Sequence, residues 1–166
     1  MENSSTLYML CGKMAAGKST LAIEMSRRLG VMVIVEDHLL ASLYPDEITD
    51  VDTYLDRSAR LKTAMEPIIV DLLAHGASVI LDFPANTVQQ RAWFAGLAEK
   101  AKAKHELHYI EIDDSTCKKQ LLKRLVENPD RASTDTVEVY DAITKYFEPP
   151  SADEGLSITH YDRTGS

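Results

Sequence analysis

The sequence of 166 residues has few cysteines and aromatic residues, no long apolar run and no basic stretch. Two cysteines, Cys11 and Cys117, are too few for a disulfide framework, and no histidine pattern accompanies them as in a zinc site. Both lie in apolar segments, so we expect reduced core residues. No apolar run approaches the roughly 20 residues of a membrane span, and the first residues lack the pattern of a signal peptide. These absences favour a cytoplasmic protein without a membrane segment.

Charge and composition narrow the class of partner. Lysine and arginine together number 18 against 26 acidic residues, and the formal net charge of −8 argues against binding to nucleic acid. Hydrophobic residues make up 45% and charged residues 27%, the usual composition of a globular domain. We expect one domain over residues 1–166, present as a monomer or homodimer.

A phosphate-binding motif lies near the N-terminus. Residues 12–19 read GKMAAGKS and match G-x-x-x-x-G-K-[ST], after an apolar run at residues 7–11 and before a helical pattern. Gly12 and Gly17 permit the tight turn that lets backbone N–H groups converge on a phosphate at a helix N-terminus. Lysine in this motif reaches the β- and γ-phosphates, and the hydroxyl after it binds Mg²⁺. The predicted nucleotide contacts are Gly12, Lys13, Met14, Ala15, Ala16, Gly17, Lys18, Ser19 and Thr20.

Apolar runs that suit strands alternate with segments of helical periodicity along the whole chain. This alternation predicts a parallel sheet with right-handed crossovers and helices on both faces. The run at residues 31–35 is β-branched and uninterrupted, which predicts a strand buried on both faces. The expected strands are residues 7–11, 31–35, 77–82, 107–112 and 156–159. The first expected helix starts at residue 20. The other helices are expected at residues 39–43, 51–75, 88–104, 115–127 and 136–147.

Caps and breaks set the expected helix boundaries. Asp50 is expected to cap the long helix, and Pro67 to kink or divide it. Asp114 or Ser115 is expected to cap the helix after the fourth strand. Asp135, with a glutamate three residues later, predicts a capping box for the last helix.

Two aspartates stand at the ends of predicted strands. Asp37 follows the second strand, and Asp82 ends the third. Ligands of open α/β sheets gather outside the carboxyl ends of the strands, so both carboxylates are candidates for a site. Each also has a structural alternative, as a helix N-cap for Asp37 and as a cap of the following loop for Asp82.

These features occur in an order that resembles a known family. The phosphate loop at residues 12–19, Asp37, Asp82 and an arginine-bearing stretch at residues 124–131 follow one another as in the small P-loop kinases of the nucleoside/nucleotide-kinase-like superfamily. The chain most resembles the AAA_33-type predicted kinases, related to chloramphenicol phosphotransferase, zeta toxins and the kinase domain of polynucleotide kinase. The resemblance implies a three-layer α/β fold, a five-stranded parallel sheet of order 2-3-1-4-5 and a short arginine-bearing lid. It also implies transfer of the ATP γ-phosphate to a hydroxyl of a small molecule.

The resemblance also assigns catalytic and metal-binding roles to matching residues. Lys18 and Asp37 would be catalytic, with Asp37 accepting the proton of the acceptor hydroxyl. Ser19 and Asp82 would bind Mg²⁺, with Asp82 acting through water. ATP and Mg²⁺ are therefore the implied cofactors.

The implied lid contains two arginines of interest. Arg131 would be catalytic by stabilising the transferred phosphoryl group, and Arg124 would bind ATP by stacking on adenine. In the structural alternative, Arg131 pairs with Asp130 or Asp135 on the surface. The predicted acceptor contacts are Asp37, His38, Arg57, Arg60 and Asn86, with Arg91 as a further candidate; a structural histidine and solvated arginines are the alternatives.

Two other functions stay open at this point. One is a nucleotide-binding regulatory protein that hydrolyses slowly or not at all, and the other is a kinase of a macromolecular or nucleotide-sugar acceptor. No asparagine starts the N-K-x-D sequence that reads guanine, so a GTPase is not expected. About ten residues separate the helix of Arg124 from the last helix, too few for a zinc-bearing lid. The sequence does not identify the acceptor.

Overall fold

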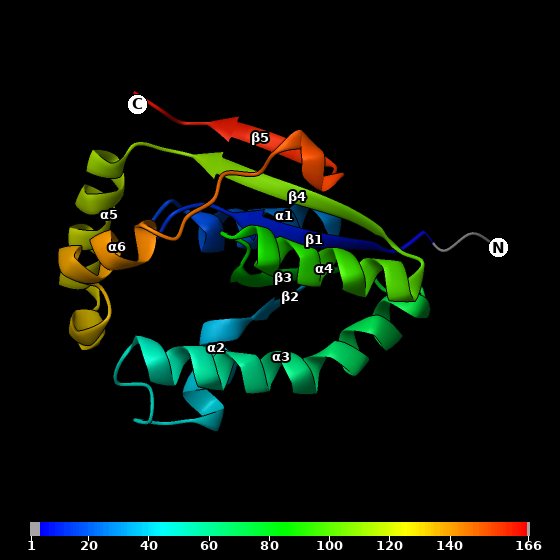
Figure 1. The fold of residues 1–166 in the computed structure, drawn as a ribbon, viewed down its shortest axis with the longest axis horizontal. Helices are drawn as coiled ribbons and strands as arrows, with labels where there is room; N and C mark the ends of the chain where they lie inside the picture. The colour runs from blue at the N-terminus through cyan, green and yellow to red at the C-terminus, as the bar shows by residue number, and fades with distance from the viewer. Residues whose placement is uncertain (1–3, 166) are drawn as a thin grey trace.

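The computed structural model describes residues 4–165, so residues 1–3 and 166 of the expected domain lie outside the described residues. Its centre is a five-stranded sheet in which every neighbouring pair is parallel and the order is β2-β3-β1-β4-β5. Helices cover both faces (Figure 1). The predicted fold class and strand order are confirmed. The strands are β1 (Thr6–Cys11), β2 (Met32–Val35), β3 (Val79–Pro84), β4 (Lys104–Glu111) and β5 (Ile158–Asp162).

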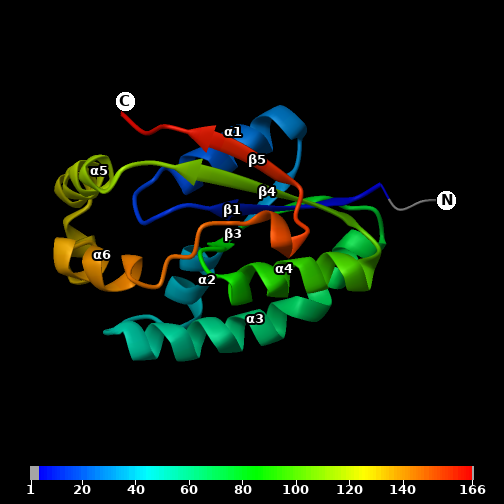
Figure 2. The ribbon, with the colours of Figure 1, turned by 45° about the horizontal axis from the view of Figure 1, so that its top comes forward.

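The helices form two layers and one cluster. In Figure 2, α1 lies above the sheet and α3 and α4 lie below it, while α5 and α6 lie at the end toward which the strands point. The helices are α1 (Lys18–Leu29), α2 (Glu36–Leu43), α3 (Val51–Ala74), α4 (Val88–Ala101), α5 (Asp114–Glu127) and α6 (Val137–Thr144), with short 3-10 helices η1 (Pro129–Ser133) and η2 (Ala152–Glu154). None of the helices described in residues 4–165 is long and apolar enough to cross a membrane.

The central strand β1 shows why the sheet is buried on both faces. Leu7, Met9 and Cys11 pack into the core beneath α3 and α4, whereas Leu10 packs into the core on the α1 side. Side chains alternate between the faces of a strand, so an uninterrupted apolar run fills both cores. Cys11 and Cys117 are both buried and free, as predicted.

The prediction for residues 31–35 was wrong in one respect. Residues 32–35 form β2, but β2 lies at the edge of the sheet, and Met32 is 55% exposed. None of the four residues of β2 is fully buried. An apolar run predicts a strand but carries no information on how many neighbours the strand will have.

The long helix α3 continues through Pro67, so Pro67 does not divide it, and the alternative of a kink stays a prediction. Buried Leu61 and Ile69 lie on either side of the proline and pack into the same core, which holds both halves of the helix against the sheet. Glu66, next to the proline, accepts a hydrogen bond from the indole of Trp93 at 3.2 Å and pairs with Lys100 on α4. Tertiary packing here outweighs the local cost of a proline.

Several helix starts differ from the predicted ones. Asp50 caps α3 as expected, through a 2.7 Å bond from the Thr53 amide. α5 is capped one residue earlier than predicted, by Asp113, which accepts from the Thr116 amide. α2 begins at Glu36 with Val35 as its N-cap, so the alternative of Asp37 as an N-cap was wrong.

The last helix is also capped by a different residue. The hydroxyl of Thr136 accepts from the Val139 amide at 3.1 Å, so Thr136 is the N-cap of α6 and the predicted capping box of Asp135 was wrong. The side chain of Asp135 is instead buried against two arginines, described below. α6 ends at Thr144, short of the predicted end at residue 147.

The segment between α6 and β5, residues 145–157, runs back along α4 to the start of β5 (Figure 1). Arg91 on α4 is wholly buried and binds both carboxylate oxygens of Glu154, at 2.7 and 3.1 Å, and the carbonyl of Ala85 at 3.0 Å. The expectation that Arg91 contacts the acceptor was therefore wrong, because its guanidinium holds this segment to the core. The fifth strand starts at Ile158 rather than at residue 156.

Candidate active site

The loop between β1 and α1 has the backbone geometry that its glycines predict. Gly17 precedes α1 with φ at 100°, a left-handed conformation that side chains rarely adopt. At Gly12, a Cβ would lie 3.3 Å from both the Ile110 carbonyl oxygen and the Ala16 Cβ, so a larger residue would require β4 or Ala16 to shift by a few tenths of an ångström. Ala15 also has a positive φ of 60°. The loop therefore turns tightly onto the N-terminus of α1, an arrangement that suits an anion.

The side chain of Lys18 folds back over this loop. Its ammonium nitrogen donates to the carbonyl oxygens of Gly12 at 2.5 Å and Lys13 at 3.0 Å. Burial lowers the pKa of Lys18, while the nearby carboxylate of Asp82 acts in the opposite direction. The ammonium group is thus held beside the backbone that is expected to bind phosphate.

Ser19 and Asp82 meet at the carboxyl edge of the sheet. The Ser19 hydroxyl donates to Oδ2 of Asp82 at 2.8 Å, joining the start of α1 to β3. Burial raises the pKa of Asp82; the Ser19 bond and the Lys18 charge oppose this, and the charge of Asp37 adds to it. Within residues 4–165, no group of three or more His, Cys, Asp or Glu side chains could hold a metal ion. Two oxygen donors fit Mg²⁺, which takes few protein ligands and completes its shell with water and phosphate.

Asp37 and His38 lie in the first turn of α2, directly after β2. The side chain of Asp37 is 67% exposed. Burial is the main cause of the raised pKa of Asp82. The charge of Asp37 raises this pKa further, and the charge of His38 lowers it. The structure therefore brings the two predicted strand-end aspartates to the same edge of the sheet.

Arg124 and Arg131 converge on one carboxylate. Nε of Arg124 lies 2.6 Å and Nε of Arg131 lies 2.8 Å from Oδ2 of Asp135. The pairing of Arg131 with Asp135 matches the predicted structural alternative, but Asp135 is only 1% exposed, so this is not a surface pair. Burial lowers the pKa of Lys18 and the charge of Asp82 raises it; the charge of Arg124 also lowers it, by a smaller amount. Arg124 therefore lies close enough to act on the phosphate loop.

The remaining loop residues have structural contacts of their own. Lys13 donates through its ammonium group to Asp114 at 2.7 Å, and the hydroxyl of Tyr140 donates to the same oxygen at 2.7 Å. This chain of contacts joins the phosphate loop to the start of α5 and to α6. Met14 and Ala15 are partly buried against the α1-side core, Ala16 is buried, and Thr20 is exposed in the first turn of α1.

Asn86 forms hydrogen bonds that join two segments of the chain, and its predicted contact with an acceptor stays a prediction. Its side-chain oxygen accepts from the Gly12 amide at 2.9 Å, and its carbonyl oxygen accepts from the Glu148 amide at 2.9 Å. The carboxylate of Glu148 also accepts from the Val88 amide at 2.7 Å. Asn86 thereby fixes the start of the phosphate loop and the segment after α6.

Arg57 and Arg60 on α3 both have carboxylate partners. The guanidinium of Arg57 contacts Glu47 at 3.0 Å and Asp56 at 2.6 Å, and it lies 5.0 Å from the ring centre of Tyr44. Nε of Arg60 contacts Asp56 at 3.1 Å. An acceptor would have to compete with these pairs, and contacts from Arg57 and Arg60 to an acceptor stay predictions.

Two residues near the site were missed in the sequence. Glu36 is buried and accepts from the hydroxyls of Tyr54 at 2.5 Å and Ser58 at 2.8 Å, which ties α3 to the turn that carries Asp37. Its position at the end of an apolar strand was the available signal. Nη1 of Arg163 lies 3.4 Å from where a Cβ of Gly17 would be, beside the phosphate loop. Nothing local in the sequence predicts that contact.

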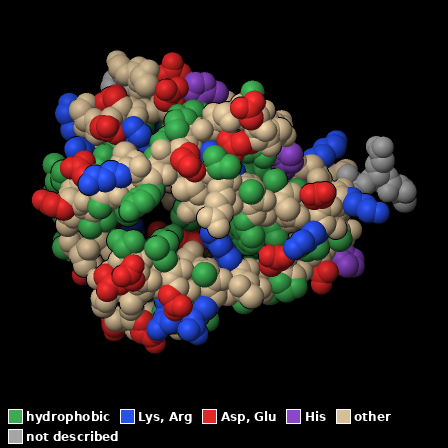
Figure 3. Space-filling model, in the orientation of Figure 1, with side chains coloured by type: hydrophobic (Ala, Val, Ile, Leu, Met, Phe, Trp, Pro, Cys, Tyr) green, Lys and Arg blue, Asp and Glu red, His purple; other side chains and the backbone are tan. Residues whose placement is uncertain are grey.

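The face that carries these residues is hollowed. Figure 3, in the orientation of Figure 1, shows a depression with hydrophobic side chains around it, between the region of α6 and the region of α2. It lies at the end of the sheet toward which the strands point, the end at which α2 begins (Figures 1 and 3).

Comparison with known proteins agrees with this arrangement. The model of the AAA_33 family, described as an AAA domain, matches residues 7–150. No curated protein sequence matches the chain. The solved structures that share the fold include the following three. The first is a candidate kinase from Chloroflexus aurantiacus, with a TM-score of 0.75 and 15% identity over 98% of this chain and 90% of that one.

The second is the APS kinase CysC of Mycobacterium tuberculosis in complex with AMPPNP and APS, with a TM-score of 0.66 and 15% identity over 98% of this chain and 90% of that one. The third is Kti12 of Chaetomium thermophilum in complex with ADP-AlF3, with a TM-score of 0.64 and 16% identity over 93% and 89%. At such identities the likeness is one of fold. The family match over residues 7–150 carries the assignment, and the chain belongs to the AAA_33 family, with the fold of the P-loop kinases.

Proposed function

We propose that this protein is a kinase that transfers the γ-phosphate of ATP to a hydroxyl of a small molecule, with Mg²⁺ as its metal. The observation that carries the proposal is the placement of three groups at one end of the sheet: the Lys18 ammonium lies on the Gly12 carbonyl of the loop, and the Ser19 hydroxyl lies on the Asp82 carboxylate. A cation, a hydroxyl and a carboxylate around a tight loop at a helix N-terminus match the needs of phosphoryl transfer. The fold it shares with an APS kinase bound to AMPPNP and APS supports the choice of nucleotide and of a small acceptor.

The nucleotide side of the site is supported by the loop and by two arginines. Backbone N–H groups of the loop and the N-terminus of α1 would bind the phosphates, and Lys18 would exchange its carbonyl partners for the β- and γ-phosphates. Arg124 and Arg163 both act near the loop and would add positive charge on the nucleotide.

Mg²⁺ would be held by Ser19 directly and by Asp82 through water. When bound, the ion neutralises charge on the phosphates. In the structure the Ser19 hydroxyl donates a hydrogen bond to the Asp82 carboxylate. This bond would be replaced by contacts with the ion and its water when Mg²⁺ binds.

The acceptor would enter through the hollow next to α2. Its hydroxyl oxygen attacks the γ-phosphorus, the bond to the β–γ bridging oxygen breaks, and the hydroxyl proton passes to the Asp37 carboxylate. Arg131, which lies next to Asp37, would stabilise the charge on the transferred group. His38, Arg57, Arg60 and Asn86 are the proposed acceptor contacts, with the competing partners described above.

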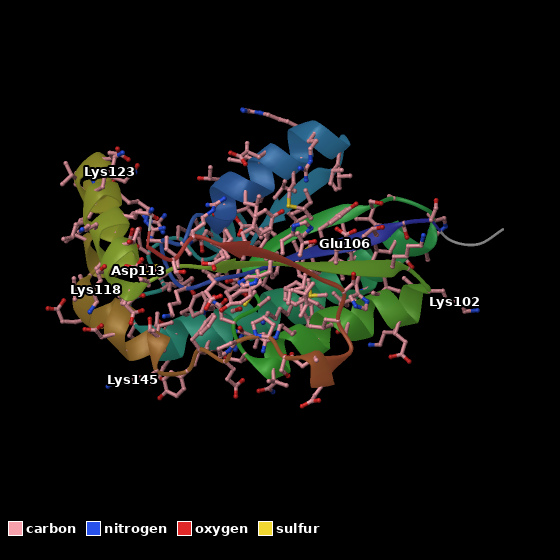
Figure 4. The ribbon with its side chains drawn as sticks, turned by 90° about the horizontal axis from the view of Figure 1, so that it is seen from above. Lys102, Glu106, Asp113, Lys118, Lys123 and Lys145 are labelled. Atoms are coloured by element: carbon pink, nitrogen blue, oxygen red, sulfur yellow. The ribbon has the colours of Figure 1, made fainter. Side chains whose placement is uncertain are left out.

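An ATP-consumption screen over hydroxylated metabolites and antibiotics tests this function. Lys18→Ala is the blank, and Lys123→Ala, which removes an exposed lysine from α5 (Figure 4), is the matched control. We expect acceptor-dependent ADP formation by the wild type and the control alone. Failure to bind ATP analogues at all contradicts the proposal. Tight ATP binding without turnover on any acceptor would favour a regulatory nucleotide-binding protein instead.

A further inference from the structure

Asp135 is the most deeply buried acidic side chain of the lid segment, residues 128–136. It is 1% exposed, and a single oxygen, Oδ2, accepts from Nε of both Arg124 and Arg131. Its other oxygen lies 3.4 Å from the hydroxyl of Thr134. Two guanidinium groups that come from different elements, α5 and η1, are therefore fixed relative to each other by one atom.

The local backbone explains why Asp135 points inward. Thr136 provides the N-cap of α6, so the carboxylate of Asp135 is not needed at the helix start. The Asp135 amide donates to the Arg131 carbonyl at 2.7 Å, and the Thr134 amide donates to the same oxygen at 3.0 Å. These bonds close a compact turn that brings the Asp135 side chain back onto η1 and α5.

The electrostatics favour an ionised Asp135. Burial pushes the pKa of Asp135 upward, but the hydrogen bonds and charges of Arg131 and Arg124 outweigh it, so the pKa lies below its ordinary value. A buried carboxylate without such partners would be strongly destabilising. Asp135 offsets one of the two guanidinium charges, and the carboxylate of Asp37 lies 3.9 Å from Arg131. The arginine side chains are 33% and 39% exposed, so both guanidinium groups stay accessible to a bound phosphate.

The orientation of the arginines is as important as their charge. Each contact with Asp135 uses Nε, so the terminal nitrogens are turned to other groups. Nη2 of Arg131 lies 3.9 Å from the carboxylate of Asp37, and the charge of Arg124 reaches Lys18. The terminal nitrogens of Arg131 thus face the first turn of α2, and Arg124 lies close enough to Lys18 for its charge to be felt at the phosphate loop.

We propose that Asp135 is a positioning residue, which holds Arg124 and Arg131 as one unit so that both guanidinium groups reach the γ-phosphate of the bound nucleotide. The inference rests on the proposed function, and it makes Asp135 necessary for the lid although Asp135 itself touches neither ATP nor the acceptor. A guanidinium must be correctly oriented to form two hydrogen bonds with a phosphate. The group is planar, so anchoring its Nε restricts the orientation of the plane in which the two terminal nitrogens lie.

The test compares the affinity for MgAMPPNP, which carries a γ-phosphate group, with the affinity for MgADP, by titration calorimetry. For Asp135→Asn we expect the preference for MgAMPPNP to fall about tenfold relative to wild type. In a background that carries both Arg124→Ala and Arg131→Ala, the same substitution should change this preference by less than about twofold, because both residues that Asp135 positions are gone. Asp141→Asn is the matched control, since it removes the 2.8 Å pair between α6 and Lys118 of α5 and leaves both arginines alone (Figure 4).

The outcomes separate this inference from the proposed function. A wild type that binds neither nucleotide overturns the kinase proposal. A wild type that prefers MgAMPPNP, with an equal preference in Asp135→Asn, overturns only the role of Asp135. So does an effect of equal size in both backgrounds, which would indicate general destabilisation. Should Asp135→Asn not fold, as judged by thermal unfolding, Asp135→Glu keeps the buried charge but moves it, and the same cycle applies.

Discussion

Nη2 of Arg131 lies 3.9 Å from Oδ2 of Asp37, so the lid segment reaches the first turn of α2. The two residues come from different elements, η1 and α2, and both are partly or largely exposed. In the proposed reaction, one accepts a proton and the other stabilises the phosphoryl group. Because the two side chains lie close together, Arg131 can contact the phosphoryl group while Asp37 contacts the hydroxyl that attacks it.

Arg131 should therefore affect the rate of transfer more than binding. We expect Arg131→Ala to lower the single-turnover rate by about 100-fold or more, because the charge on the γ-oxygens loses its planar partner. Arg124→Ala should mainly weaken ATP binding. Normal single-turnover rates for Arg131→Ala, once an acceptor is known, would remove this residue from the site and leave its pair with Asp135 as a structural contact.

Asp37→Asn should remove most of the turnover while leaving nucleotide affinity close to wild type. Loss of a general base lowers rates by about 10²–10⁴-fold, and the amide keeps the size of the side chain. Steady-state kinetics and MgADP titration measure the two effects separately. Asp52→Asn, an exposed aspartate in the first turn of α3, is the control. A collapse of nucleotide affinity in Asp37→Asn would place Asp37 in the metal site instead.

Asp82→Ala should raise the Mg²⁺ concentration needed for half-maximal activity. The carboxylate bonds to Ser19 and would hold the water shell of the ion, so its loss weakens a site that has few protein ligands. A titration of activity with Mg²⁺ at saturating ATP measures the shift. An unchanged Mg²⁺ requirement would return Asp82 to its alternative role in capping the following loop.

The pair of Arg91 and Glu154 should be important for stability rather than activity. Glu154→Gln leaves a buried guanidinium without its counter-charge, which costs about 3–5 kcal/mol in unfolding free energy. Replacing both residues, as in Arg91→Met with Glu154→Leu, should cost far less, since it removes both buried charges. Urea unfolding at pH 7 measures both variants, and equal losses in the single and double variants would contradict this account.

The same pair predicts a pH dependence. Burial raises the pKa of Glu154, but its bonds to Arg91 and to the Ser151 amide lower it more, so the pKa in the folded protein lies below the ordinary value of 4.5. A carboxyl with a depressed pKa contributes stability that is present above pH 4.5 and is lost as the pH falls through the folded value. The double variant should lose less stability than wild type below pH 4.5 in acid unfolding experiments.

What the sequence could predict was mostly local. The phosphate loop and the positions of Asp37 and Asp82 near the carboxyl ends of their strands follow from residues adjacent in the chain, although β3 continues two residues past Asp82. The strand order came from the family resemblance. Arg91 illustrates the limit. An arginine on a helix is usually solvated, and its buried partner Glu154 lies 63 residues away, so only the tertiary structure joins them.

The start of α6 shows a second limit. Asp135 and Thr136 are both good N-caps, and a glutamate three residues after Asp135 favoured the wrong one. The choice between them depends on Arg124 and Arg131, whose positive charges bind the buried carboxylate. Local propensity was nearly balanced here, so a tertiary contact decided the helix boundary.

The anchoring of α6 limits how far the lid segment can travel. Tyr140 is bonded to Asp114, which also holds Lys13 of the phosphate loop, and Glu148 is bonded to Asn86, which holds Gly12. A displacement of α6 as a whole would therefore pull on Gly12 and Lys13, the first two residues of the phosphate loop. Residues 128–136 are tied to α5 as well, because Asp135 bonds both Arg124 and Arg131, so Arg131 has little freedom to move relative to Arg124.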